Sequence, residues 1–256
     1  MRKLVVALFS LGLMAGCTST DSEFVDTDGI TAIFDVEVAE QDGGATVWAI
    51  LHQGDADSST YVKMSGGDKL IAAVSVAGGQ YTSDKEMDEQ QAFGSTAYRA
   101  DFSDFDDGSE EFKIEFDRSG SGKDSALAST VVLPPKFGFS GFQIDQVDVV
   151  DTSHIAFSRS SQDFYVQWDP FNPSADYDMG YEVDGPCIAA QTVGTADVGG
   201  YEFDPNTIRS ATGKDAETCQ VTFRLIRSND GTVDSAFMGG KFKASQIREF
   251  TFTSAP

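Results

Sequence analysis

Basic residues and histidine are scarce in this chain. Its 256 residues include 18 Lys and Arg against 41 Asp and Glu, so the formal net charge is −23, and only 2 residues are His. Because a surface of this sign repels phosphate groups, we expect no nucleic-acid partner. His52 and His154 each lie in or beside an apolar stretch. No Ser-His-Asp or Cys-His arrangement and no Gly-x-Ser-x-Gly motif accompanies them. The sequence therefore predicts a protein that is not an enzyme.

The N-terminus carries the pattern of an export signal. Arg2 and Lys3 precede an apolar run at residues 4–14, which is followed by Ala, Gly and Cys17. The run is too short to cross a bilayer, which needs about 20 apolar residues. The Ala-Gly-Cys ending resembles the lipobox of bacterial lipoproteins, although Met14 stands where that family usually has Leu. The resemblance implies cleavage before Cys17 and its modification by acyl chains such as palmitate. An ordinary secretory signal with a chance cysteine is the alternative.

The residue after Cys17 bears on localisation. In the lipoprotein family, an Asp at that position retains the protein in the inner membrane. Here Thr18 follows the cysteine. The resemblance therefore implies an outer-membrane lipoprotein of a Gram-negative cell envelope, anchored in the lipid bilayer through acylated Cys17. Whether it faces the periplasm or the exterior stays open.

The other two cysteines, Cys187 and Cys219, form an even pair in a chain that we expect to be exported. An oxidising compartment favours a disulfide bond between them, and two free buried thiols are the alternative. A zinc site is not indicated, because no Cys-x-x-Cys pair occurs and no histidine lies near either residue.

Long α-helices are not expected, because no segment keeps a hydrophobic period of 3.6 residues. Apolar and polar residues instead alternate with period two, as at Phe34, Val36 and Val38 against Asp35 and Glu37. This alternation indicates half-buried strands, which Gly, Asp and Ser turns separate. In the first half we predict strands at residues 34–38, 46–51, 61–64, 70–76, 96–102, 112–116 and 126–133, with a long loop at 82–95.

The second half has the same style. We predict strands at residues 147–150, 154–158, 163–168, 180–183, 187–192, 200–203, 219–227 and 248–253. A turn is expected at residues 229–231, and single helical turns are expected at 215–217 and 244–247. Arginines are prominent for so acidic a chain, and we expect them to pair with carboxylates of this half: Arg159, Arg209, Arg224, Arg227 and Arg248.

Pro134 and Pro135 end the last strand of the first half, because proline cannot donate to a strand ladder. The predicted layout is a signal peptide at 1–16, a polar tether at 17–28, one β-sandwich at 29–135 and a second at 136–256. Seven strands in roughly 105 residues is the count of an immunoglobulin-like domain. The expected fold is all-β, with two tandem immunoglobulin-like antiparallel sandwiches. This layout resembles a class of bacterial surface lipoproteins.

Two groups of residues are weak candidates for ligand sites. The densest acidic run contains Asp104, Asp106 and Asp107, whose oxygens could hold calcium, although their order does not match an EF-hand loop. A solvated loop is the alternative there. Aromatic residues near turns of the second half could stack on sugar rings, and a buried core is the alternative for them. These aromatic residues are Trp168, Phe171, Tyr177 and Tyr181.

The function indicated by these features is a membrane-anchored, non-enzymatic binding or assembly module at the cell envelope. An envelope protein or a surface glycan would be its partner. One alternative is a carbohydrate-binding module of a polysaccharide-utilisation system. Another is a calcium-stabilised adhesion domain, with calcium as the possible cofactor.

Overall fold

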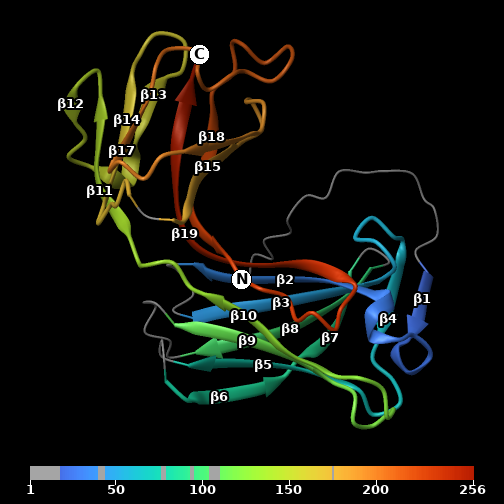
Figure 1. The fold of residues 1–256 in the computed structure, drawn as a ribbon. Coiled ribbons are helices and arrows are strands. Elements are labelled where there is room, and N and C mark those ends of the chain that lie inside the picture. The colour runs from blue at the N-terminus through green and yellow to red at the C-terminus, as the bar shows by residue number, and fades with distance from the viewer. Residues whose placement is uncertain (1–17, 40–43, 76–78, 93–94, 104–109, 175) are drawn as a thin grey trace.

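The computed structural model describes residues 18–39, 44–75, 79–92, 95–103, 110–174 and 176–256. Within these ranges the protein is all-β, and its helical elements are the short 3-10 turns η1 (Ser22–Phe24), η2 (Thr27–Gly29) and η3 (Thr152–His154). No helix in the same ranges is long and apolar enough to cross a membrane. The strands gather in two groups, which we call the first half and the second half (Figure 1).

The first half is a sandwich of two sheets. One face belongs to an 11-stranded sheet that both halves share, and the other is a four-stranded sheet in the order β10-β9-β5-β6. Alternating apolar residues of both sheets point between them, as Phe34, Val36 and Val38 do from β2. The strands are β1 (Thr18–Asp21), β2 (Ile30–Ala39), β3 (Gly44–Gln53), β4 (Thr60–Lys63), β5 (Lys69–Ser75), β6 (Tyr81–Glu86), β7 (Asp88–Ala92), β8 (Ser95–Ser103), β9 (Glu111–Asp117) and β10 (Ala126–Val132).

The second half packs a four-stranded sheet, in the order β12-β11-β14-β17, against the other end of the shared sheet. Phenylalanine fills the space between them, and Phe164 contacts Phe142, Phe157 and Phe252. The strands are β11 (Gly138–Ile144), β12 (Val147–Asp148), β13 (Ala156–Ser158), β14 (Phe164–Asp169), β15 (Asp178–Asp184), β16 (Gln191–Thr195), β17 (Gly200–Phe203) and β18 (Cys219–Asp230).

The last strand, β19 (Gly239–Ala255), belongs to both halves and is visible as the long red strand in Figure 1. Its first part pairs in parallel with β2, and its whole length from Lys243 pairs antiparallel with β18. Phe242 and Ala244 complete the core of the first half, whereas Phe252 lies in the core of the second. Gly240 has φ of 147°, and a Cβ there would meet the Ala32 carbonyl oxygen, so glycine is required for the approach to β2.

Buried polar side chains hold the junction between the halves (residues 134–137). Arg227 Nη1 donates to the Pro135 carbonyl oxygen at 2.9 Å, and Arg248 Nε donates to the Phe137 carbonyl oxygen at 2.6 Å. The Gln246 amide donates to the Pro134 oxygen at 3.3 Å. Both guanidinium groups lie over the Phe137 ring, at 4.6 Å and 5.1 Å from its centroid. Because these carbonyl oxygens accept hydrogen bonds from buried side chains, the junction is a packed segment.

The structure confirms the all-β class, and each of the seven strands predicted for the first half is present. Strands β1, β6 and β7 are additional. The two cores lie on either side of Pro135, except that the segment with Phe237, Phe242 and Ala244 returns to the first core. The exact division into tandem domains therefore stays a prediction.

Residues 18–28 do not form the free tether that their polarity indicated. β1 pairs in parallel with β4, and Ser22, Val25 and Thr27 are buried. Their partner is Arg118, which is fully buried, forms an ion pair with Asp68 at 3.1 Å and donates to the carbonyl oxygens of residues 22 and 25. A polar segment is thus ordered by a buried cation that lies about 90 residues farther along the chain.

Four other local predictions were wrong. Residues 82–86 lie in β6 and residues 88–92 form β7, where a loop was expected. Polar residues suffice there, because β6 is an edge strand and its side chains are largely exposed. Residues 229–230 continue β18 instead of forming a turn, and residues 244–247 lie in β19 instead of a helical turn. Both follow from the antiparallel pairing of β18 with β19, which includes these residues. Strand β16 begins at Gln191, four residues later than predicted.

Candidate functional site

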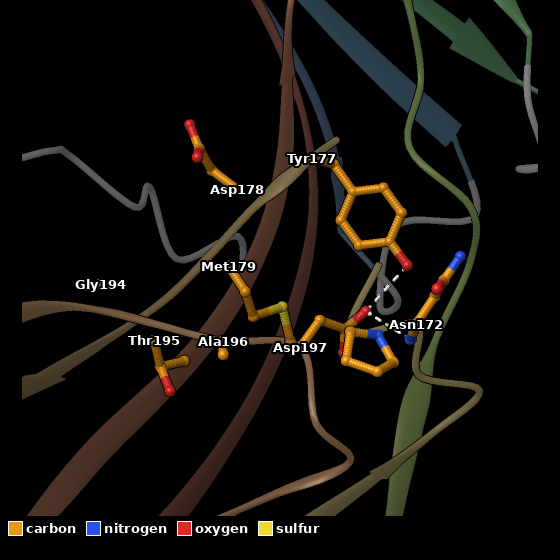
Figure 2. Close-up of a pocket in the computed structure, with 9 residues that line it drawn as sticks. Asn172, Tyr177, Asp178, Met179, Gly194, Thr195, Ala196 and Asp197 are labelled. Carbon is orange, nitrogen blue, oxygen red and sulfur yellow. Dashed lines mark hydrogen bonds between the residues drawn. The ribbon is translucent and has the colours of Figure 1, made fainter. Parts of the chain in front are cut away.

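An open pocket of about 440 Å³ lies where β15 begins and β16 ends (Figure 2). Figure 2 shows Met179 next to Thr195 and Ala196 at the β16 end, and the Tyr177 hydroxyl directed at Asp197. Most of its side chains are uncharged. The lining residues are Asn172, Pro173, Tyr177, Asp178, Met179, Gly194, Thr195, Ala196 and Asp197.

Asp197 is a buried residue of this pocket, and its hydrogen bonds hold the residues around it. Its Oδ1 accepts a hydrogen bond from the Trp168 indole at 2.6 Å. Its Oδ2 accepts from the Tyr177 hydroxyl at 2.8 Å, the Asn172 backbone N–H at 3.1 Å and Arg227 Nη2 at 2.8 Å. Oδ1 thus accepts one hydrogen bond and Oδ2 accepts three. Asp197 therefore joins Asn172 and Tyr177 to Trp168 and Arg227 of the second half.

Arg227 provides the charge that balances Asp197. The side chains of both residues are almost fully buried, with exposed fractions of 1% and 3%. The guanidinium also donates to the Pro170 carbonyl oxygen at 2.7 Å and lies 4.9 Å from the centre of the Tyr177 ring. Because the ring rests on Arg227 and its hydroxyl is bonded to Asp197, Tyr177 presents a rigid wall to the pocket.

The protonation states follow from these contacts. Burial raises the pKa of Asp197, but the hydrogen bonds from Trp168, Tyr177 and Asn172 and the charge of Arg227 outweigh it, so this pKa lies below the ordinary aspartate value. Burial and the hydrogen bond to Asp197 raise the pKa of Tyr177. At neutral pH the carboxylate is ionised and the phenol keeps its proton. This arrangement suits recognition, since Asp197 is held by four donors and its charge is balanced by Arg227.

The pocket adjoins an open sheet edge. In the part of the chain that the structure describes, β16 is the last strand of the shared sheet, paired with β15 on one side only. Its sequence, QTVGT, contains no charged residue and no proline, which are the usual devices that protect an edge from pairing. By contrast, edge strand β6 carries Asp84, Lys85 and Glu86.

The predicted aromatic face is not assembled as expected. Trp168 and Tyr181 are buried, with exposed fractions of 1% and 3%, because their strand positions point into the second core. They cannot offer a ring to a ligand. Tyr177 lines the pocket, and Phe171 is half exposed, with its ring against the backbone of Gly199.

The cysteine pair was predicted correctly. Cys187 and Cys219 form a disulfide bond with their Cα atoms 5.8 Å apart. Cys17 and the three acidic candidates Asp104, Asp106 and Asp107 lie outside the described residues. Elsewhere in the described ranges, no group of three or more His, Cys, Asp or Glu side chains could hold a metal ion. Calcium binding by the acidic run therefore stays a prediction.

The histidines lie apart from the pocket. His52 is buried, and its Nδ1 lies 2.8 Å from the Ser58 carbonyl oxygen. His154 is exposed beside Ser153 and Asp151, the residue types of a hydrolase triad. Both neighbours contact the same ring nitrogen, Nδ1, at 2.9 Å and 3.0 Å. In a triad the serine and the carboxylate use opposite nitrogens, so this cluster is a surface cap of η3.

The sequence prediction missed Asp197, the central residue of the site. The expectation that arginines pair with carboxylates holds for Arg227 with Asp197 and for Arg224 with Glu182 and Glu249. Arg159 and Arg248 instead donate mainly to backbone oxygens. A buried Trp168 needs an acceptor for its indole N–H, which was a usable signal. Its partner lies 29 residues away, beyond the reach of local patterns.

Comparison with known proteins adds little to this geometry. No protein-family model and no curated protein matches the chain. A solved structure that matches is the crystal structure of CBD12 from CALX1.2. The match has 11% sequence identity, covers 84% of this chain and 98% of the other, and has a TM-score of 0.22. A likeness at that TM-score carries no argument about the function of this chain.

Proposed function

We propose that this protein is an acylated lipoprotein of the outer membrane and a non-enzymatic binding module. Its partner is another envelope protein, which adds an extended segment to the open edge of β16. The observation that carries the partner site is the coincidence of that unprotected edge with the rigid pocket beside it. An added strand forms backbone hydrogen bonds with the edge, and one of its side chains enters the pocket.

The residues that line the pocket restrict the kind of partner side chain that can enter it. Pro173, Tyr177, Met179 and Ala196 contribute apolar groups, and Arg227 already balances the charge of Asp197. Because the exposed Asp178 also lines the pocket, an uncharged or basic side chain suits it better than an acidic one. The wall formed by Tyr177 lowers the entropic cost of binding, since hydrogen bonds to Asp197 hold Tyr177 and Asn172 before the partner arrives.

The membrane part of the proposal is supported by the Cys17 motif and by Thr18. Acylation is tested by metabolic labelling with an alkyne fatty acid in the native cell. We expect the label in the full-length protein and its loss in Cys17→Ala, which should leave the membrane fraction. An unlabelled, soluble wild-type protein would refute the anchoring.

The partner site is tested with Gly194→Lys. A Cβ at Gly194 meets no atom within 4 Å, so the side chain fits while it places a charge at the edge and the pocket. Gly138→Lys in β11 is the matched control, because its Cβ also meets nothing within 4 Å. A photo-cross-linking residue at Thr192 reports the contact in native membranes.

We expect one discrete cross-linked protein with the wild type and with Gly138→Lys, and at least a tenfold smaller yield with Gly194→Lys. Equal yields from all three proteins would place the contact elsewhere. The absence of any discrete product would count against β16 as a docking edge.

A further inference from the structure

The outer face of the four-stranded sheet carries a row of side chains that the partner site does not use. Phe164 and Val166 of β14 are buried, so Tyr165 between them points to the opposite face. In the strand register, Gln143 of β11 and Glu202 of β17 lie directly beside Tyr165. Paired residues of this kind have Cβ atoms about 4.5–5.5 Å apart, so the three side chains form one continuous surface.

The phenol end of Tyr165 lies over a glycine of the neighbouring strand. A Cβ built on Gly200 would lie 2.1 Å from the Tyr165 hydroxyl oxygen and 2.5 Å from the carbon that bears it. The end of the ring therefore occupies the space that any larger residue at position 200 would fill. The Tyr165 side chain is only partly buried there, so it stays accessible on the outer face.

A polar pocket of about 320 Å³ lies beside this ring. It is lined by Tyr165, Gln143, Glu202, Gln146 and Asp163. The two amides provide both donors and acceptors, and the two carboxylates provide acceptors. No Lys, Arg or His lines the pocket, so an anionic ligand has no counter-charge there.

The turn that contributes Gln146 is held in place. Asp145 and Gln146 join β11 to β12 with φ values of 51° and 65°. The Asp145 carboxylate accepts hydrogen bonds from the Gln162 amide at 2.8 Å and from the Asp163 N–H at 3.1 Å. The polar rim of the pocket is therefore fixed relative to the sheet before a ligand binds.

We propose that this face binds a neutral glycan, with Tyr165 as the stacking platform and Gln143, Gln146, Asp163 and Glu202 as hydrogen-bonding partners of the hydroxyl groups. A sugar ring presents a flat patch of C–H groups to an aromatic face and hydroxyl groups around its edge. The site offers matching groups: the aromatic ring of Tyr165 for the C–H patch, and hydrogen-bond donors and acceptors for the hydroxyl groups. This site is separate from β16, so it is an additional function and does not depend on the partner proposal.

A structural role for Tyr165 makes a different prediction. An aromatic ring that covers a glycine on a neighbouring strand stabilises a sheet without any ligand. In that case Tyr165→Ala would lower the melting temperature and change nothing else. The decisive experiment therefore measures binding and stability on the same variants.

The test is affinity electrophoresis of the full-length mature protein in native gels. The gels contain galactomannan, xyloglucan, mixed-linkage glucan, arabinoxylan or amylose, and alginate is the anionic control. We expect retardation in at least one neutral gel and none in alginate. Tyr165→Ala should weaken binding at least about tenfold, whereas Tyr165→Phe, which keeps the ring, should bind within about threefold of the wild type.

Two further variants keep the outcome interpretable. Tyr81→Ala removes an exposed tyrosine of the first half and should bind like the wild type. Glu202→Ala changes an exposed residue of the site and should weaken binding even if Tyr165→Ala proves unstable. The proposal is overturned by no retardation in any neutral gel. It is equally overturned if folded Tyr165→Ala and Glu202→Ala proteins are retarded as strongly as the wild type. Gly194→Lys should leave this retardation unchanged, which separates the two proposals.

Discussion

Neutralising Asp197 should cost much of the stability of the second half. Asp197→Asn keeps the shape of the side chain but leaves Arg227 buried without its counter-charge, and the Asn side-chain nitrogen cannot accept the bonds that the carboxylate oxygen accepts. Removing one partner of a buried ion pair typically costs about 3–5 kcal/mol. For a chain of this size that loss corresponds to a fall of about 6–20 °C in melting temperature.

Trp168 provides a local readout of this change. Its buried indole donates to Asp197, whereas the other tryptophan, Trp48, lies in β3 of the first half. Urea unfolding followed by fluorescence in a Trp48→Phe background therefore reports on the second half. Glu217→Gln is the matched control, because it breaks an ion pair with Lys214 in the same half whose side chains are about half exposed, and it should cost less than about 1 kcal/mol.

The pH dependence gives the sign of the effect. Because the folded-state pKa of Asp197 is lowered, its contribution is present above the unfolded value of about 3.9 and is lost as the pH falls through the folded value. Asp197→Asn should remove this part of the acid sensitivity. Arg227→Met combined with Asp197→Asn should cost less than the sum of the single variants, since no charge stays buried. A loss below about 1 kcal/mol for Asp197→Asn would refute the central role of this carboxylate.

Two further predictions concern other buried links. Replacing both Cys187 and Cys219 by serine opens a loop with a sequence separation of 32 residues and should lower the free energy of unfolding by about 3–4 kcal/mol in urea titrations; an unchanged midpoint would show that the disulfide adds no stability. Arg118→Met leaves Asp68 buried without its partner and frees the carbonyl groups of residues 22 and 25, so residues 18–29 should become sensitive to proteolysis at a rate at least tenfold above the wild type. Cleavage at the wild-type rate would mean that β1 and the following turns hold without the arginine.

The sequence predicted those features of the fold that depend on neighbouring residues, and it missed those that depend on contacts between distant parts of the chain. The alternation of Phe34, Val36 and Val38 reports only on the two faces of one strand, and it predicted β2 correctly. One of the two partners of β2 is β19, more than 200 residues farther along the chain, and no local pattern encodes that pairing. Residues 82–95 looked like a loop because edge strands need few buried side chains.

The candidate site was less predictable for a related reason. Tyr177 was identified because aromatic residues near turns are conspicuous, but burial reversed the expectation for Trp168 and Tyr181. Asp197 is one of many acidic residues, and only the folded chain distinguishes a carboxylate that receives four hydrogen bonds from one that faces water. In a sequence with so many acidic residues, composition alone does not distinguish the carboxylate that organises the site.

The position of β19 has a consequence for the order of events during synthesis. The ribosome finishes β2 and β3 early, yet Phe242 and Ala244, which complete their core, are made only with β19. A nascent chain that stops at Pro135 lacks this partner of β2 and leaves that edge of β2 open. We therefore expect the first half to stay incompletely folded until β19 has been made. During that interval the exposed edge of the apolar strand β2 would be a binding site for a chaperone.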